Sequence, residues 1–177
     1  MSSISSRRLR KELNEIQTEG CPTGITLLSA DNFETWYFSI EILGESLYQG
    51  EVFKLMFRFD PSYPISAPAV QFVVNQESTA PVHPHVYSNG HICASILGTE
   101  WSPVLSVSAV CVTLQSMLAS CKSKERPVDN DRYVRYAPDN PKKTRFHYDG
   151  KWQVHCIYPS AYGVCSAYLL KQLDDTV

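Results

Sequence analysis

The chain has 177 residues, which is enough for one well-buried domain with tails and too few for two domains of ordinary size. Its formal net charge is -2 at pH 7. Proteins that bind nucleic acid usually present a strongly basic face, so we expect no nucleic-acid partner.

The cysteine pattern and the N-terminal composition bear on the cellular compartment. Six cysteines could form three disulfides in a secreted protein, but residues 1 to 10 are rich in serine and arginine and hold no apolar signal core. We therefore expect an intracellular protein with reduced thiols. Residues 152 to 170 hold no Asp, Glu, Lys or Arg, yet Gln153, His155, Pro159 and Gly163 interrupt them, so a membrane anchor is not expected.

The first predicted element is a helix that Ser5 or Ser6 caps. Apolar side chains recur in it at spacings of four and three, and Gly20 and Pro22 end it. This apolar stripe consists of Leu9, Leu13 and Ile16. The remaining surface is basic, through Arg7, Arg8, Arg10 and Lys11, and we interpret it as a solvated face, with a docking site for an acidic partner as the alternative.

Runs of alternating apolar residues follow, which is typical of strands with one buried face. They lie at residues 36 to 42, 53 to 59 and 70 to 72, and a fourth, weaker strand is predicted at 25 to 28. Successive segments of period two predict a four-stranded antiparallel meander. Pro61 and Pro64 interrupt the chain after residue 59, because proline cannot donate to a strand ladder.

Residues 79 to 101 keep neither the helical nor the strand period and are rich in Pro, His, Asn and Gly. A structured loop of this length inside a compact domain is usually functional. Cys93 lies in it, just after a Ser-Asn-Gly turn and shortly beyond His83 and His85. A thiol held there by the chain is a candidate nucleophile.

A second helix begins after Ser106, which can cap it. Its apolar face is the clearest helical pattern of the chain and consists of Val107, Val110, Cys111, Leu114, Leu118 and Cys121. We interpret Cys111 and Cys121 as buried small hydrophobic residues. A short helix is predicted at 130 to 136, and the ordered domain is expected to end near residue 150. This order of elements describes an α+β domain with helices packed on an antiparallel sheet.

Several short motifs accompany the loop of residues 82 to 93, namely Tyr63-Pro64, Trp101-Ser102-Pro103, Arg126-Pro127 and Asp129-Asn130. Together these motifs resemble the ubiquitin-conjugating enzyme family, and above all its W-type members. The similarity extends from residue 8 to about residue 148. The resemblance implies the ubiquitin-conjugating fold in residues 1 to 150, with an N-terminal helix, the meander, an active-site loop, a long central helix and a short C-terminal helical segment. Residues 151 to 177 are then a C-terminal tail of unknown role.

The resemblance also implies an activity. Cys93 accepts ubiquitin from a ubiquitin-activating enzyme as a thioester and passes it to a substrate amine, together with a ubiquitin ligase of the RING or U-box type. The activating enzyme consumes the ATP, so no metal and no organic cofactor is implied. The implied location is cytoplasmic and nuclear.

Two histidines of the loop receive roles by the same resemblance. His85 stands where most members carry an asparagine that supports the loop or the oxyanion. A ring N–H could donate in the same way, because a developing oxyanion needs a fixed donor about three ångström away. His83 matches the motif histidine, which we interpret as a loop-ordering residue in preference to a catalytic one. Weaker candidates for orienting the amine are Asp129, Asn130 and Glu125.

The loop after the second helix predicts the kind of amine. Typical members carry an acidic loop that helps to deprotonate a lysine, whereas residues 120 to 126 are mostly basic. A lysine with a pKa near 10.4 is about four-hundred-fold less deprotonated at neutral pH than an α-amine near 7.8. Poor help from a base therefore favours α-amino groups, and the W-type resemblance implies the same substrates, proteins with flexible N-termini.

Ligase docking in the family uses the first helix and the loops around Tyr63-Pro64 and Trp101-Ser102-Pro103. The candidate contacts in this chain are Arg8, Lys11, Ile65, Ser102 and Pro103. Ile65 stands where a phenylalanine is frequent, and its smaller apolar area should weaken the contact.

Other functions stay open on the residues alone. His83, His85, His91 and Cys93 have the ligand types of a four-ligand zinc site. A non-catalytic ubiquitin-binding adaptor of the same fold, a cysteine hydrolase with a histidine base, and an enzyme for another ubiquitin-like modifier are further alternatives.

Overall fold

The structure is a computed structural model that describes residues 3–144. The predicted domain end near residue 150 and the tail at 151 to 177 lie outside the described residues. The elements in chain order are α1 (Ile4–Glu19), β1 (Ile25–Ser29), β2 (Thr35–Glu41), β3 (Val52–Arg58), β4 (Ala69–Phe72), the 3-10 helix η1 (Ser95–Leu97), α2 (Val107–Ala119), α3 (Asn130–Tyr136) and the 3-10 helix η2 (Pro141–Lys143). The α+β prediction is confirmed.

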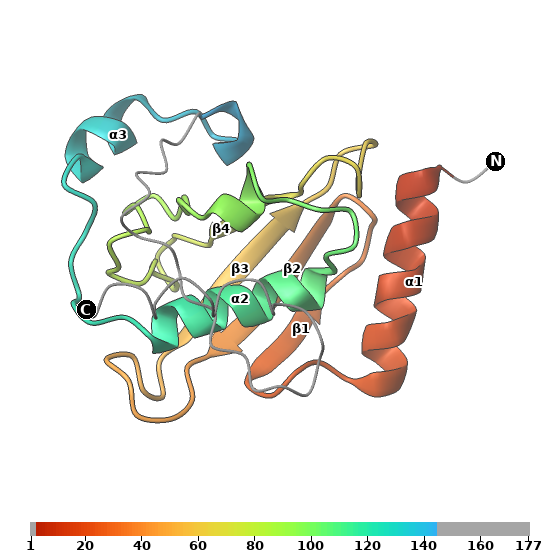
Figure 1. Ribbon diagram of the computed structural model, residues 1–177, viewed down its shortest axis with the longest axis horizontal. Coiled ribbons are helices and arrows are strands. Elements are labelled where there is room, and N and C mark those ends of the chain that lie inside the picture. The colour runs from red at the N-terminus through yellow and green to blue at the C-terminus, as the bar shows by residue number, and fades with distance from the viewer. Residues whose placement is uncertain (1–2, 145–177) are drawn as a thin grey trace, which may run out of the picture.

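The sheet has four strands in the order β1-β2-β3-β4, and every neighbouring pair is antiparallel. In the register, Phe38 lies opposite Leu55 and Phe57 opposite Val70. Side chains of one face of this sheet are fully buried, because successive residues of a strand point to opposite faces. Figure 1 shows α2 crossing one face of the sheet, with α1 and α3 on opposite sides of the molecule. The predicted meander is therefore confirmed.

Helix α1 begins earlier than the sequence pattern predicts. Its cap is Ser3, whose hydroxyl accepts a hydrogen bond from the backbone N–H of Ser6 at 3.0 Å. The prediction of a cap at Ser5 or Ser6 was therefore wrong. Ile4 is exposed, so it can take the first position of the helix without packing against the core. Leu9 and Ile16 are buried as predicted. A carboxylate lies on the same face, since Glu12 is 3% exposed.

Helix α2 forms the centre of the core. The Ser106 hydroxyl accepts from the backbone N–H of Ala109 at 3.2 Å, which confirms the predicted cap. Cys111 is fully buried, and burial raises the pKa of its thiol well above the ordinary value. Cys121 lies beyond the end of the helix and is half-buried, so only Cys111 is fully buried as expected. None of the helices in residues 3–144 is apolar over a length that could span a membrane.

Candidate active site

The loop that carries Cys93 folds back on itself as a small hairpin. Val86 and Ile92 form an antiparallel bridge, and the Tyr87 N–H donates to the His91 carbonyl at 2.9 Å. At the turn, Gly90 has a φ of +89, and a Cβ there would lie 2.1 Å from the carbonyl oxygen of Phe72. Only glycine fits this position, so Gly90 allows the hairpin to pack closely against β4.

Cys93 and His85 are joined in both directions across this hairpin. The Cys93 N–H donates to the His85 carbonyl at 2.8 Å, and the His85 ring hydrogen-bonds to the backbone of Cys93. Both residues are half-buried. Burial lowers the pKa of His85, while the bond to the Cys93 backbone acts to raise it. Because that bond favours the protonated ring, the ring is the donor and the backbone carbonyl the acceptor.

His83 lies beneath the hairpin and is 4% exposed. Its Nδ1 accepts from the His85 N–H at 3.0 Å, and the ring also hydrogen-bonds to the backbone of Met117 in α2. Burial lowers the pKa of His83 to about 4, so the ring is neutral at pH 7. A neutral imidazole has one N–H and one acceptor nitrogen, and these two contacts use both. His83 thus ties the loop to the central helix.

His91 is buried in a similar way, at 2% exposure. Its Nδ1 lies 2.8 Å from the Tyr133 hydroxyl, and the ring hydrogen-bonds to the backbone of Asp139. Burial lowers the pKa of His91 as well. Within residues 3–144 no group of three or more His, Cys, Asp or Glu side chains is placed to hold a metal ion. The alternative zinc site therefore has no cluster of ligands in the described part of the chain.

Two tyrosines and an aspartate lie beside Cys93, and sequence reasoning did not select the tyrosines. The rings of Tyr87 and Tyr133 are in contact, with centroids 3.9 Å apart and planes tilted by 33°, and the Tyr87 hydroxyl donates to Asp129 Oδ1 at 3.2 Å. Burial raises the pKa of both tyrosines, and electrostatic coupling to the Asp129 carboxylate and to the ionised form of the Cys93 thiol raises it further. Tyr87 belongs to the loop motif and could have been selected, whereas the short helix that holds Tyr133 has no sequence signal for it.

The other two candidates for orienting the amine differ in position. Asn130, the first residue of α3, accepts from the Ser88 N–H at 2.8 Å and so contacts the turn of the hairpin. Glu125 is exposed and accepts from the Ser123 hydroxyl on its own loop at 2.9 Å. The structure brings Asp129 and Asn130 to the loop of Cys93, but it gives Glu125 a contact only within the neighbouring loop.

Arg126 holds the start of the same loop. Its guanidinium donates to the backbone carbonyls of Ala80, Pro81 and Val86 at 3.0, 2.6 and 3.0 Å. A planar guanidinium has fixed donor directions, which suits a set of converging carbonyls. Val86 is the residue that pairs with Ile92, next to Cys93. Arg126 therefore fixes the strand of the hairpin that faces the nucleophile candidate.

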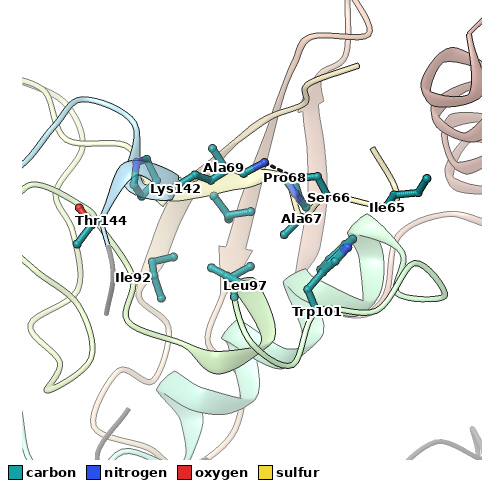
Figure 2. Close-up of a pocket in the computed structure, with 13 residues that line it drawn as sticks. Ile65, Ser66, Ala67, Pro68, Ala69, Ile92, Leu97, Trp101, Lys142 and Thr144 are labelled. Carbon is teal, nitrogen blue, oxygen red and sulfur yellow. Dashed lines mark hydrogen bonds between the residues drawn. The ribbon is translucent and has the colours of Figure 1, made fainter. Parts of the chain in front are cut away.

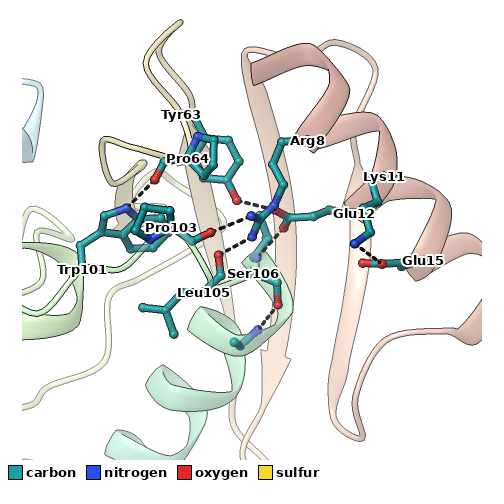
Figure 3. Close-up of polar contacts among 12 residues, drawn as sticks. Arg8, Lys11, Glu12, Glu15, Tyr63, Pro64, Trp101, Pro103, Leu105 and Ser106 are labelled. Carbon is teal, nitrogen blue, oxygen red and sulfur yellow. Dashed lines mark hydrogen bonds and ion pairs between the residues drawn. The ribbon is translucent and has the colours of Figure 1, made fainter. Parts of the chain in front are cut away.

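Three of the predicted ligase contacts, Arg8, Lys11 and Pro103, lie where α1 meets two loops (Figure 3). The Arg8 guanidinium donates to the carbonyls of Pro103 at 2.6 Å and Leu105 at 2.8 Å, and it forms an ion pair with Glu12. Glu12 also accepts from the Tyr63 hydroxyl at 2.6 Å and from the Val107 N–H at 2.7 Å. This carboxylate connects α1, the loop before β4 and the start of α2, a role that the sequence pattern did not reveal.

The outer surface of this region is apolar. Ile65 is 74% exposed and Val104 is 81% exposed, while the indole N–H of Trp101 donates to the Pro64 carbonyl at 2.8 Å and fixes the two loops together. Ser102 is half-buried and Pro103 exposed. Lys11 lies on the next turn of α1, where its ammonium is 3.6 Å from Glu15 (Figure 3). The five predicted residues thus lie in one region, but Arg8 is already bound within the domain.

Comparisons with known proteins agree with this arrangement. Residues 8–153 match the family model described as ubiquitin-conjugating enzyme. The chain is 48% identical over 145 residues to the probable ubiquitin-conjugating enzyme E2 W-A of Danio rerio, covering 80% of this chain and 93% of the relative. It is 45% identical over 154 residues to the ubiquitin-conjugating enzyme E2 W of Caenorhabditis elegans, covering 84% and 99%. Among solved structures, the ubiquitin conjugating enzyme E2 UbcA1 from Agrocybe aegerita is similar with a TM-score of 0.78 and 74% identity, covering 79% of this chain and 99% of that one.

Proposed function

The chain belongs to the ubiquitin-conjugating enzyme family and is of its W type, and on that premise we propose that Cys93 carries ubiquitin as a thioester and delivers it to the α-amino groups of flexible substrate N-termini. As a family member it works with ubiquitin, an activating enzyme and ligases. The ligase is proposed to be of the RING or U-box type. The cytoplasmic and nuclear location stays a prediction.

The position of Cys93 among the described cysteines is the observation that carries this proposal. Cys111 is fully buried with a raised thiol pKa, which makes its thiolate scarce and inaccessible. Cys121 donates its S–H to the Ser123 carbonyl at 3.1 Å, within the loop that follows α2. Cys93 is half-buried on a hairpin that Gly90, His83 and Arg126 hold in place. A positioned, accessible thiol is what acyl transfer needs.

The proposed reaction has two acyl transfers. In the first, the Cys93 thiolate attacks the thioester carbonyl of ubiquitin on the activating enzyme, a new C–S bond forms, the old one breaks, and the sulfur of that enzyme leaves as a thiolate. In the second, a neutral substrate amine attacks the Cys93 thioester, a C–N bond forms and the C–S bond breaks. The Cys93 sulfur leaves as the thiolate, and the amine nitrogen loses one proton to water. A thioester suits the role because sulfur leaves readily.

His85 is proposed to support the loop and not to bind the oxyanion. Its lowered pKa keeps the ring neutral at pH 7, so the ring has a single N–H. The bond to the Cys93 backbone uses that N–H, which leaves an acceptor nitrogen, and an acceptor cannot stabilise a developing negative charge. His83 is likewise proposed to order the loop through the Met117 backbone.

Asp129 is proposed to guide the incoming amine. Its carboxylate accepts a hydrogen bond from the Tyr87 hydroxyl on the hairpin. Its negative charge contributes to the raised pKa of Tyr87 and of Tyr133, which lie beside Cys93. A fixed carboxylate can accept a hydrogen bond from the incoming amine and so hold it facing the thioester. Asn130 accepts a hydrogen bond from the Ser88 N–H, and we propose that this contact holds α3 against the loop. The contact of Glu125 with Ser123 gives it no comparable support.

The preference for α-amines rests on the loop between α2 and α3. Lys124 forms an ion pair with Glu51 and lies 4.5 Å from the ring centroid of Tyr48, while Arg126 binds backbone carbonyls. These contacts anchor a basic loop beside the site, which raises the cost of a second, lysine-derived cation nearby. An α-amine is about four-hundred-fold more deprotonated than lysine at neutral pH and depends less on a base.

A single-turnover experiment tests this preference. Enzyme charged with ubiquitin is separated from the activating enzyme and mixed with one of two matched peptides, one with a free N-terminus and no lysine, the other N-acetylated with one lysine. We expect faster discharge onto the free N-terminus at pH 7, with a rate that levels off above about pH 8. Equal rates, or faster discharge onto lysine, would overturn the proposed specificity and leave the carrier role of Cys93 intact.

The proposed ligase surface comprises Lys11, Ile65, Ser102 and Pro103, with Arg8 as the residue that organises it. Exposed apolar side chains near the centre of an interface usually contribute most of the binding energy, and Ile65 and Val104 are the exposed ones here. Arg8 holds the loop through the Pro103 and Leu105 carbonyls. Replacing Arg8 should therefore weaken ligase binding indirectly, through the shape of the loop.

A further inference from the structure

An open groove of about 410 Å³ lies on the side of the domain where the described chain ends. Its walls are the stretch from Ile65 to Val70, η1 with Trp101, and the η2 segment (Figure 2). Figure 2 shows Lys142 and Thr144 at one end and Trp101 and Ile65 at the other, with Ile92 and Leu97 between them. Apolar side chains dominate the lining, which makes the groove a site for an apolar group.

We infer that the chain itself fills this groove, with the ring of Phe146 placed against Ile92 and Leu97. The occupant is the segment of residues 145 to 150, which follows the described residues directly. The inference concerns the assembly of the domain and does not depend on the transfer chemistry of Cys93.

The described chain reaches the groove at Thr144 in an extended conformation. Thr144 lines the groove, and its hydroxyl lies 3.1 Å from that of Tyr133, so its side chain faces the domain. Its backbone is extended, with φ -95 and ψ 134. The proposal continues this extended backbone through residue 146. In an extended chain residues i and i+2 point to the same side, which would turn Phe146 toward the domain and His147 away from it. At about 3.6 Å per residue, two residues span roughly 7 Å, which is enough for Phe146 to enter the groove that Thr144 lines.

The charges at the rim favour an aromatic occupant. Lys142 is the cation that lines the groove, and it already binds Asp60 at 2.6 Å and the Ser66 hydroxyl at 2.7 Å. Burial acts to raise the pKa of Asp60, but its hydrogen bonds, above all the one from the Lys142 ammonium, lower it overall, so this pair stays ionised at neutral pH. An apolar ring entering beside a satisfied ion pair leaves no polar group of that pair without a partner.

The extent of the family match gives independent support. The match to the family model continues to residue 153, beyond Thr144, so the segment that follows η2 belongs to the pattern of the domain. A domain segment with Phe146 and Tyr148 needs an apolar surface, and the groove lies where this segment begins. A second copy of the chain or a substrate peptide would have to compete with a tethered occupant at high effective concentration.

Methyl and aromatic NMR of the full chain tests the inference. We expect nuclear Overhauser contacts between the Phe146 ring and the methyl groups of Ile92 and Leu97. The variant Phe146→Ser should shift those methyl signals and the Trp101 indole signal, whereas the control His147→Ser, on the outward side, should leave them within the line width.

Two results would overturn the inference. One is the absence of contacts between Phe146 and the groove in the wild-type chain, with equal spectra for both variants. The other is contacts that appear only between differently labelled copies in a mixed sample and disappear on dilution, since these would assign the groove to a second copy. Because the first readout uses the wild-type chain, the test holds even if Phe146→Ser folds poorly.

Discussion

Replacing Glu12 by alanine is predicted to destabilise the fold by about 3 to 5 kcal/mol. The carboxylate is 3% exposed and accepts from the Tyr63 hydroxyl, the Val107 N–H and the Arg8 guanidinium. Tyr63 and Val107 are each 1% exposed, so both donors would lose their partner away from water, at about 1 to 3 kcal/mol each. Arg8 would keep its hydrogen bonds to the Pro103 and Leu105 carbonyls, so the loss of its ion pair with Glu12 contributes less to the destabilisation.

The assay is urea unfolding followed by tryptophan fluorescence, with Glu15→Ala as the control on the same helix. Glu15 is half-exposed and 3.6 Å from Lys11, so its removal should cost under about 0.5 kcal/mol. In the Glu12→Ala background, the further change Tyr63→Phe removes the stranded hydroxyl and should restore part of the lost stability. If Glu12→Ala costs no more than Glu15→Ala, the reasoning that this carboxylate joins three elements is refuted.

Three further predictions follow from the loop and its surroundings. The pKa of His83 is about 4 in the folded protein against 6.5 for the free side chain, so the unfolded state binds the proton at a higher pH than the folded state. The free energy of unfolding should therefore fall by about 3 kcal/mol as the pH drops from above 6.5 to 4. Urea titrations across that range should show this loss reduced in His83→Gln, and equal slopes would contradict the assignment. Arg126→Lys should lower the free energy of unfolding by about 1 to 3 kcal/mol and speed amide hydrogen exchange at residues 85 to 93, because an ammonium cannot donate to three carbonyls as the planar guanidinium does. Unchanged exchange would show that Arg126 does not hold this loop. Ile65→Asp should cut ligase-stimulated discharge about tenfold or more and leave ligase-free discharge unaltered, while a loss of both rates would count against a docking role.

The elements that the sequence predicted well are those with a local period. The helix at 130 to 136 has the predicted bounds, and the weakest strand, predicted at 25 to 28, ends one residue later at Ser29. The Ser106 cap was also confirmed, because a side-chain oxygen and an N–H three residues on are both local. Patterns of this kind are set by neighbours in the sequence and need no knowledge of distant partners.

The features that the sequence did not reveal depend on contacts between distant segments. Glu12 is buried because Tyr63 and Val107 both donate to it, and these residues come from separate elements. Arg126 belonged to a recognised motif, but its carbonyl partners at residues 80 to 86 follow from the folded loop alone. Tyr133 likewise lies on a short exposed helix and reaches the site only because α3 packs beside Tyr87. No periodicity predicts such partners.

The most direct test of the account is whether Cys93 becomes charged. The protein, activating enzyme, ATP and ubiquitin are combined, and the products are run on non-reducing gels with and without thiol, beside Cys93→Ala, Cys93→Ser and the control Cys121→Ser. The account predicts a thiol-sensitive adduct for the wild-type chain and Cys121→Ser, no adduct for Cys93→Ala, and a thiol-resistant ester for Cys93→Ser. An adduct that persists in Cys93→Ala, or no adduct with the folded wild-type chain, would contradict the proposal that Cys93 carries ubiquitin.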